Sequence, residues 1–323
     1  MRLKLVPSET NWNFFRFDTI TLGASCLAVI ASIVLFFVVG LNFGIDFRGG
    51  TTIRTDAHSA VDVAAYREAL QELNLGDISI TEVFDPTFDE DEHVTLINVQ
   101  AQDGQESVTA ETIAAIEAVL QQVDPTITFP SVESVGPTVS GELVQTAIIA
   151  VALAIGAVLV YIWLRFEWQF SLGAVAALVH DVTLTIGIFC LLQIRFDLAI
   201  IAALLTIVGY SLNDTVIVFD RVRENLRKYK KMELKDLLNV SINDTLSRTF
   251  MTSFTTLIAL IALFVLGGDV IRGFVFAMIW GIIVGTYSSV FVASSLLMRL
   301  GVKRDWTKTD GGGGGTQFAN IDA

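Results

Sequence analysis

The 323-residue sequence contains little of what builds disulfide frameworks, metal centres or catalytic sites. It has two cysteines and three histidines, and no cysteine–histidine spacing typical of a zinc site. Cys26 and Cys190 both lie in apolar runs and are expected to pack inside helices rather than pair. A phosphate-binding loop, a dinucleotide fingerprint and a nucleophile elbow are also missing. We therefore expect no enzyme activity, cofactor, metal or ATP site, so that any work is driven by a partner or an ion gradient.

Charged residues are scarce as well. They make up 17% of the chain, whereas hydrophobic residues make up 53% and the mean hydropathy is +0.61. This composition excludes a disordered chain and is too apolar for an ordinary soluble domain. The formal net charge of −13 is unevenly distributed, because residues 42–142 hold nineteen acidic residues against three arginines, a net charge of −16. We expect no nucleic acid partner.

Long apolar runs make up most of the remaining sequence. A polar lead over residues 1–18 precedes an apolar segment over 19–41, and about twenty such residues span the hydrocarbon core of a bilayer. This segment is too long for a signal peptide and lacks a cleavage motif, so it is predicted to be an uncleaved anchor helix. Residues 301–323 include five consecutive glycines and are predicted to form a flexible tail. Five further spans are predicted within residues 143–300: Leu143–Leu164, Phe170–Leu192, Leu198–Phe219, Phe250–Leu266 and Phe274–Leu297.

The segment over 42–142, between the first two spans, is predicted to form one small α+β domain. Its helices show a 3.6-residue period, as in Val61, Ala65 and Leu70. The order β-α-β-β-α-β is the signature of the split-βαβ, ferredoxin-like fold. The predicted elements are strand Gly50–Thr55, helix Ala60–Leu73, strand Ile78–Phe84, strand His93–Gln100, helix Thr109–Gln122 and strand Ile127–Val135.

Lysine and arginine residues orient the six spans. An even number of spans puts both termini on one side, and the lead segment is basic. The predicted loop over 220–249 holds eight basic residues against five acidic ones and falls on the same side. The acidic domain over 42–142 falls on the other. The sequence therefore predicts cytoplasmic termini and a domain outside the cytoplasm.

One carboxylate stands inside an apolar span. Asp214 lies in GYSLNDTVIVFDRVREN (209–225), five residues before Phe219, the predicted cytoplasmic end of its helix. At 1.5 Å per residue this places Asp214 roughly 7–8 Å inside that end. Because a carboxylate at the bilayer centre costs at least about 2.5–3.5 kcal/mol, we interpret Asp214 as a proton-handling or ion-pairing centre. The alternative is a structural aspartate that hydrogen-bonds a neighbouring helix, a role that Asn or Ser fills at lower cost.

Other polar residues lie near this carboxylate in the predicted topology. Arg248 stands two residues before the fifth predicted span, so its long side chain can reach the depth of Asp214. The alternative is a snorkelling arginine that follows the positive-inside rule. Asp181 and Asn213 are candidate secondary polar sites in the third and fourth spans. Asp181 is either a polar relay element or an interhelical hydrogen-bond partner, and His180 beside it is expected to be structural.

Small residues predict close helix packing in the last two spans. Gly281 and Gly285 form a G-x-x-x-G pattern, which is a helix-contact signal. The fifth and sixth spans also hold several serines and threonines, which favour polar contacts between them.

Five motifs, in order along the chain, resemble the SecF family, the smaller membrane subunits of the bacterial SecD–SecF protein-export complex. The resemblance covers the chain from roughly Phe14 to Arg304. The motifs are NFGIDFRGGT (42–51), GPTVSGEL (136–143), LVHDVTLTIG (178–187), GYSLNDTVIVFDRVREN (209–225) and LSRTFMTS (246–253).

The resemblance implies a multi-pass protein of the bacterial inner membrane, with residues 42–142 in the periplasm. It implies a 1:1, pseudo-symmetric complex with SecD, of the resistance–nodulation–division type, that associates with the SecY channel complex. Such a complex uses the proton-motive force to help exported, unfolded polypeptides across the membrane, so protons and membrane lipid are also partners. In this family the intramembrane aspartate of the fourth span and the arginine entering the fifth are implicated in proton passage, and these positions are Asp214 and Arg248. A passive channel-assembly factor and half of a proton-driven small-molecule exporter remain alternatives.

Overall fold

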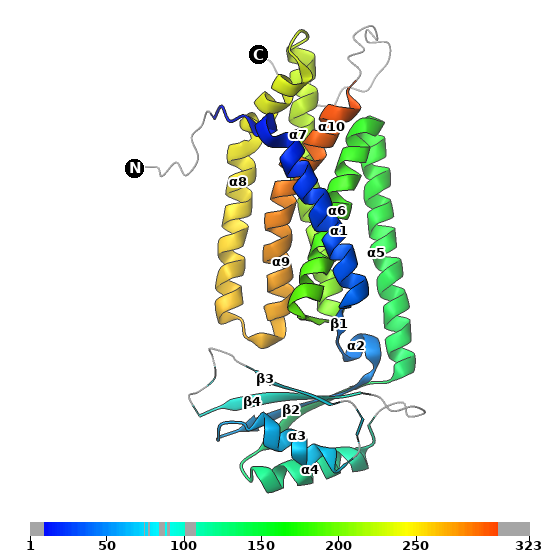
Figure 1. The fold of residues 1–323 in the computed structure, drawn as a ribbon, viewed down its shortest axis with the longest axis vertical. Coiled ribbons are helices and arrows are strands. Elements are labelled where there is room, and N and C mark those ends of the chain that lie inside the picture. Colours follow the sequence, from blue (N-terminus) through cyan, green and yellow to red (C-terminus); the bar gives the residue numbers. More distant parts are fainter. Residues whose placement is uncertain are drawn as a thin grey trace, which may run out of the picture.

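Six long helices and one α+β domain make up the computed structural model of the chain (Figure 1). The structure describes residues 10–73, 75–76, 78–83, 88, 91–100 and 108–302. Within these residues six helical segments are long and apolar enough to cross a membrane, as predicted. The predicted flexible tail beyond residue 302 and the first nine residues lie outside the described part. The spanning helices are α1 (Asp18–Val38), preceded by the short η1 (Phe14–Phe17), α5 (Pro137–Arg165), α6 (Trp168–Leu192), α7 (Leu198–Lys228), α8 (Leu234–Leu266) and a last helix composed of α9 (Asp269–Ser288), η2 (Ser289–Ala293) and α10 (Ser294–Leu300).

Two of these helices extend well beyond the apolar runs that predicted them. The stretch 220–249 was predicted as a loop, but α7 continues to Lys228 and α8 begins at Leu234, so only residues 229–233 connect the helices. A stripe of buried apolar side chains, among them Leu226, Leu237 and Ile242, packs the two extensions together. A hydropathy average combines this stripe with the charged residues around it, so hydropathy does not detect where these helices end.

The last span contains one wide turn. The η2 residues form a π-helical turn in which Ser294 Oγ donates a hydrogen bond to Ser289 O at 3.1 Å. Such turns are rare and frequently lie at functional sites. This one follows directly after Ser288, whose hydroxyl contacts a buried carboxylate.

The α+β domain has the predicted ferredoxin-like topology. Its antiparallel sheet has the order β3-β4-β2-β5 and consists of β2 (Gly50–Ala57), β3 (Ile78–Val83), β4 (His93–Val99) and β5 (Thr128–Val135). Helices α3 (Val63–Gln71) and α4 (Ala110–Val123) cover one face of the sheet. The other face is turned toward the membrane helices (Figure 1). The predicted element order is confirmed, and the ends of the elements differ from the predicted ones by at most three residues. The predicted strand end Phe84 lies outside the described residues.

Local signals start both domain helices. The Asp62 carboxylate accepts hydrogen bonds from the first free backbone N–H groups of α3, and the Thr109 hydroxyl does the same for α4. The apolar faces of these helices then pack on the sheet. The fully buried members of this core include Ile53, Leu70, Ile97, Ile116 and Leu120.

A small parallel ladder joins the α+β domain to the bundle. After α1, β1 (Asn42–Phe43) pairs with β6 (Arg195–Phe196) in the connection between α6 and α7. The short α2 (Ile45–Arg48) follows, and then Gly49 and Gly50 turn the chain into β2 with φ of +73° and +129°. Glycine adopts such angles without a Cβ clash. The ladder was not predicted because its two strands are short and far apart in the sequence.

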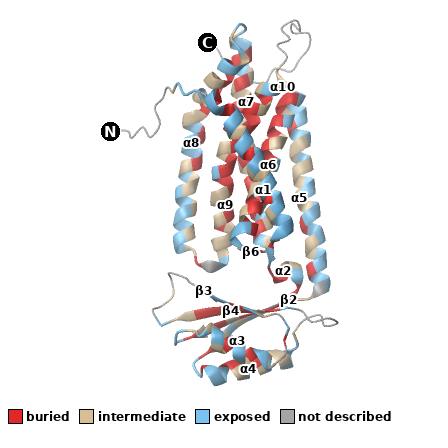
Figure 2. Ribbon diagram, viewed as in Figure 1, coloured by how far each residue is buried: buried red, intermediate tan, exposed pale blue. Residues whose placement is uncertain are grey.

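Burial within the bundle is uneven. Buried side chains gather on α6, α7 and α9, whereas α1, α5 and α8 turn many apolar side chains outward (Figure 2). Large exposed apolar surfaces of this kind are suited to lipid or to a protein partner. Examples are Ile30, Phe37, Leu153, Trp163, Ile258 and Leu266.

Candidate functional site

Asp214 lies on the buried face of α7. Its exposure is 0%, and neither carboxylate oxygen has a hydrogen-bond partner among the described residues. A buried polar group left without a partner costs about 1–3 kcal/mol, and a charged group costs more. The Thr286 hydroxyl on α9 acts on the Asp214 carboxylate, although its geometry is not that of a hydrogen bond.

Asp214 and Arg248 lie at the same level of two antiparallel helices. Asp214 is fourteen residues before the end of α7 at Lys228, and Arg248 is fourteen residues after the start of α8 at Leu234. At 1.5 Å per residue, each is about 21 Å from the connection between the helices. The predicted match in depth is therefore retained, but both residues lie near the middle of their helices. The predicted depth of roughly 7–8 Å was too shallow because the apolar run stops before the helix does.

Arg248 does not touch Asp214 in this structure. Arg248 is exposed on α8, and no hydrogen bond or ion pair joins it to the Asp214 carboxylate. Its charge acts on Asp214 through space. Beside them, Ser253 Oγ on α8 lies 2.8 Å from Thr286 Oγ1 on α9, a hydrogen bond that ties these helices together. The two predicted relay residues are thus close in level but not in contact.

Asp181 on α6 connects three helices. Ser211 Oγ on α7 and Ser288 Oγ on α9 both donate hydrogen bonds to Asp181 Oδ2, at 2.5 and 2.7 Å. The other oxygen, Oδ1, lies 2.9 Å from His180 Nδ1. All four side chains are at most 4% exposed. Of the two interpretations that the sequence left open, the interhelical hydrogen-bond partner is the one the contacts favour.

His180 has contacts beyond its neighbour Asp181. Its Nε2 is buried with no hydrogen-bond partner among the described residues. Its ring stacks on Tyr287, with centroids 6.1 Å apart and planes at 29°. The Tyr287 hydroxyl donates to Thr21 O at 3.0 Å and lies 2.9 Å from Ser25 Oγ, both on α1. Tyr287 therefore links His180, and through it Asp181, to α1.

Asn213 does not belong to this site. It is exposed on α7, whereas Asp214 next to it is buried. Successive residues on a helix point about 100° apart, so the two side chains leave α7 in different directions. The structure does not bring Asn213 together with Asp181 or Asp214.

Because α9 packs closely on α7, Ser211 and Ser288 both lie within hydrogen-bond distance of Asp181. A Cβ atom on Gly281 would overlap Ile207, and one on Gly285 would lie 3.1 Å from the Ser211 Cβ. The helix contact indicated by the G-x-x-x-G pattern is therefore a contact with α7. Reasoning from the sequence missed Ser211 and Ser288 because single serines are common in membrane helices and their partners depend on helix packing.

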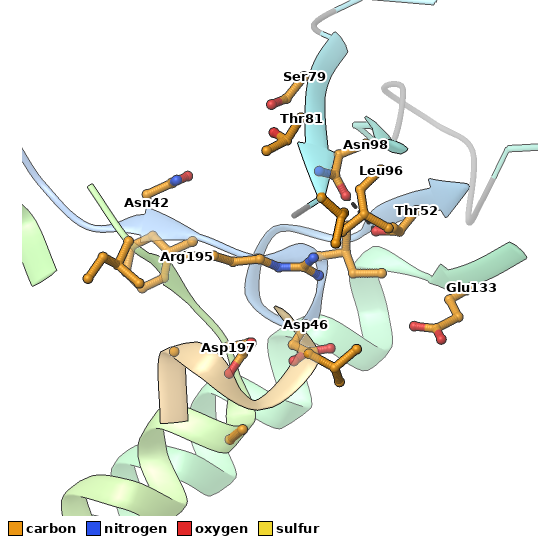
Figure 3. A pocket seen from close by; sticks show the side chains of 18 of the residues that line it. Asn42, Asp46, Thr52, Ser79, Thr81, Leu96, Asn98, Glu133, Arg195 and Asp197 are labelled. Atoms are coloured by element: carbon orange, nitrogen blue, oxygen red, sulfur yellow. Dashed lines mark hydrogen bonds between the residues drawn. The ribbon is translucent and has the colours of Figure 1, made fainter. Parts of the chain in front are cut away.

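A cavity of about 920 Å³ lies between the uncovered face of the sheet and the ends of the membrane helices. The Arg195 side chain extends into it, beside Asp46 and Asp197 (Figure 3). Asp46 accepts a hydrogen bond from Leu198 N at 3.1 Å and Asp197 accepts one from Ile200 N at 3.2 Å, so both carboxylates cap α7. Burial raises the pKa of the Asp197 carboxyl. Within the described residues, no three His, Cys, Asp or Glu side chains come together as a metal site would require.

These features define a class of protein: a multi-pass membrane protein with one folded domain inserted between its first two spans and charged residues buried among its helices. Two family models match the chain, one described as "Protein export membrane protein SecD/SecF, C-terminal" over residues 115–303 and one as "SecD/SecF GG Motif" over residues 34–61. The second range contains Gly49 and Gly50, the two glycines with positive φ.

Known proteins resemble the chain over almost all of its length. The protein translocase subunit SecF of Cereibacter sphaeroides is 62% identical over 322 residues, which cover 100% of this chain and 99% of the relative. SecDF of Brucella abortus is 41% identical over 303 residues, covering 94% of this chain and 39% of that protein. The crystal structure of SecDF from Thermus thermophilus matches with a TM-score of 0.82 and 35% identity, over 93% of this chain and 40% of that one.

The chain belongs to the SecD/SecF family of protein export membrane proteins. It matches the SecF subunits over their full length and spans about two fifths of the fused SecDF chains. It is accordingly a translocase subunit of that export machinery.

Proposed function

We propose that this protein uses the proton-motive force to help move exported, unfolded polypeptides across the bacterial inner membrane. It acts in a complex with SecD and beside the SecY channel, and it catalyses no chemical conversion. The fused SecDF relatives support a SecD partner, since one chain there contains both parts. The observation that carries the proposal is Asp214, a fully buried carboxylate that no described residue hydrogen-bonds, at the level of Arg248 on the next helix.

Asp214 is suited to bind and release a proton because its two charge states differ strongly in cost. An ionised carboxylate inside a membrane protein is expensive unless it is paired, and a protonated one is much less so. Arg248 offers a compensating charge whose distance can change with helix packing. Moving one elementary charge through 100 mV supplies about 2.3 kcal/mol, which corresponds to roughly 40-fold in an equilibrium or a rate.

The proposed orientation places both termini and the α7–α8 connection in the cytoplasm, and residues 42–142 in the periplasm. The basic residues at the α7–α8 end of the bundle support this orientation, since positive charge is retained on the cytoplasmic side. The α+β domain lies at the opposite end of the bundle (Figure 1). It is connected to the membrane through α1 and α5, so a shift of these helices would move it.

The hydrogen bonds of the buried aspartates and the names of the relatives bear on the two alternatives, a passive assembly factor and half of a small-molecule exporter. A passive assembly factor would use its buried aspartates to hold helices together, and Asp181 does so with two serines, whereas Asp214 makes no such bond. Half of a small-molecule exporter would need a second half with its own outer domain, and the SecF relatives that match this chain end to end are export subunits by name.

The proposal is tested with Asp214→Asn and Arg248→Met in the complete export complex. Both are expected to lose most of the gradient-dependent part of secretion, up to the roughly 40-fold that one charge through 100 mV supplies, while ATP-driven export continues. The matched control is Asp220→Asn on the same helix, because Asp220 is half exposed and pairs with Arg165 at 3.1 Å. This control should secrete normally.

Retained gradient-dependent secretion by a folded, SecD-bound Asp214→Asn variant would refute the proton relay and favour the assembly factor. Failure to recover SecD with the wild-type chain in a pull-down would contradict both of these functions.

A further inference from the structure

We propose that His180 is a second proton-binding site of this chain, and that Tyr287 transmits its protonation state to α1. The inference rests on the proposed proton-driven function and adds a group that carries a proton within it. Asp214 and Arg248 account neither for the buried His180 ring nor for its stacking on Tyr287, which bonds to α1.

The hydrogen bonds around Asp181 determine which nitrogen of His180 is free. Ser211 and Ser288 donate to Oδ2, which leaves Oδ1 to accept from His180 Nδ1 at 2.9 Å. With the proton on Nδ1, the Nε2 lone pair is unused, and Nε2 is the atom that is buried without a partner among the described residues. A neutral histidine in this position presents one basic nitrogen.

The charge balance of the cluster favours uptake of a proton at that nitrogen. If Asp181 is ionised and His180 neutral, the cluster carries one negative charge in a region with almost no solvent exposure. A proton from a protonated water molecule adds to Nε2, the Nδ1–H bond to Asp181 Oδ1 is kept, and water is released. The cluster then contains an imidazolium–carboxylate pair with no net charge, which is cheaper to bury than an isolated anion.

Tyr287 adds a second contact that favours the imidazolium. Its ring lies nearly parallel to the His180 ring with centroids 6.1 Å apart, close to the reach of a cation–π interaction. Protonation strengthens the attraction between the two rings. Since the Tyr287 hydroxyl is bonded to Thr21 O and Ser25 Oγ, a shift of this ring acts directly on α1.

Three buried residues of α1 face three different parts of the bundle, so a change at one of them affects how this helix is held. Asp18, Ser25 and Ser32, seven residues apart along one face, are its buried residues. Asp18 pairs with Arg299 at 3.0 Å, and Ser32 lies where a Cβ on Gly187 of α6 would be. Ser25 is the middle contact and is the one that meets Tyr287. α1 continues through β1 into the α+β domain, which gives the protonation of His180 a mechanical route to that domain (Figure 1).

The charged and titratable groups on the surrounding helices define the electrostatic setting. α1 presents hydroxyl groups at this level and its one carboxylate at its end. The groups are Asp181 on α6, Tyr287 on α9, Asp214 on α7, Arg248 on α8 and the pair of Asp18 on α1 with Arg299 on α10.

The test is ¹⁵N NMR of histidine-labelled chain in its complex with SecD in lipid bilayers. The chain has three histidines, and His58 and His93 lie in the α+β domain, so His180→Gln assigns the third signal. When the sample is taken from pH 8 to pH 5, the wild-type His180 signal should change from that of the Nδ1–H tautomer to that of the imidazolium. Asp181→Asn removes the carboxylate that faces Nδ1, so the change between the two signals should differ from that of the wild type. A His180 that stays neutral across this range, or titrates identically in Asp181→Asn, overturns the proposal.

A second arm measures gradient-dependent secretion against pH. His180→Gln should lower it and flatten its pH profile, and Tyr287→Phe should lower it while the NMR titration persists, because the ring stays and the link to α1 is lost. The control His93→Gln should match wild type. An unchanged pH profile in His180→Gln refutes the role in transport. The outcomes separate the two proposals, since the NMR titration of His180 does not depend on whether Asp214→Asn secretes.

Discussion

Replacing Gly281 with alanine tests whether the close approach of α9 to α7 builds the buried polar cluster. A Cβ at this position would come within 2.8 Å of three outer carbons of Ile207. Ile207 is β-branched and sits in a helix, where one side-chain rotamer strongly predominates, so it cannot swing clear. The added methyl group must therefore push the two helices apart. Gly209 is the matched control, because a Cβ there would meet no atom within 4 Å.

The expected magnitude follows from comparing these two glycines. Forcing a methyl group into a packed interface costs about 1–3 kcal/mol. The helix-propensity gain of alanine over glycine, about 1 kcal/mol, applies to both variants and cancels in their difference. Gly281→Ala should therefore be less stable than Gly209→Ala by about 1–3 kcal/mol. It should also weaken the Ser288–Asp181 hydrogen bond of 2.7 Å, because Ser288 lies at the end of the displaced helix α9.

Unfolding of the purified chain in a detergent titration, followed by tryptophan fluorescence, measures this difference. Gradient-dependent secretion of the same variants shows whether the cluster is disturbed. Equal stabilities for Gly281→Ala and Gly209→Ala would refute the packing argument, since then nothing would resist the added methyl group.

Two further predictions concern the ends of the molecule. Hydrogen bonds from Ser59 and Thr126 lower the pKa of the Asp124 carboxyl in the folded protein. The ionised Asp124 therefore stabilises the α+β domain fully above the unfolded-state pKa of about 3.9. This stabilisation is lost as the pH falls through the lower folded-state pKa. Ser59→Ala should therefore move the acid unfolding of this domain to higher pH. Hydrogen exchange measures the midpoint of this unfolding, and an unchanged midpoint would contradict the prediction. Asn243 exchanges two hydrogen bonds with the backbone of Trp12, both at 2.9 Å. Asn243→Ala should speed amide hydrogen exchange at Trp12 about tenfold, because two partly exposed hydrogen bonds contribute roughly 1.4 kcal/mol. Exchange at the wild-type rate would show that these bonds do not stabilise the N-terminal segment.

The site was only partly predictable from the sequence. Asp214 was visible because a carboxylate in an apolar run is a local anomaly, and Arg248 because it stands at the edge of the next run. Their equal level near the middle of both helices was not visible, since it depends on apolar side chains of α7 and α8 pairing across the connection. The contact between His180 and α9 was not visible for a related reason. Its partner on α9, Tyr287, lies more than a hundred residues away, and no periodicity along one helix identifies it.

Hydropathy and periodicity are properties of short stretches, and they determined six membrane spans, the β-α-β-β-α-β order of the domain and the presence of buried charge. Burial and hydrogen bonding of a given side chain depend on which helices meet, and that is decided by packing across the whole bundle. Tertiary structure alone therefore distinguishes the two buried aspartates. Asp181 on α6 accepts hydrogen bonds from two serine hydroxyl groups because Gly281 and Gly285 let α9 lie close to α7. Asp214 lies on α7, one turn after Ser211, and no described residue hydrogen-bonds its carboxylate.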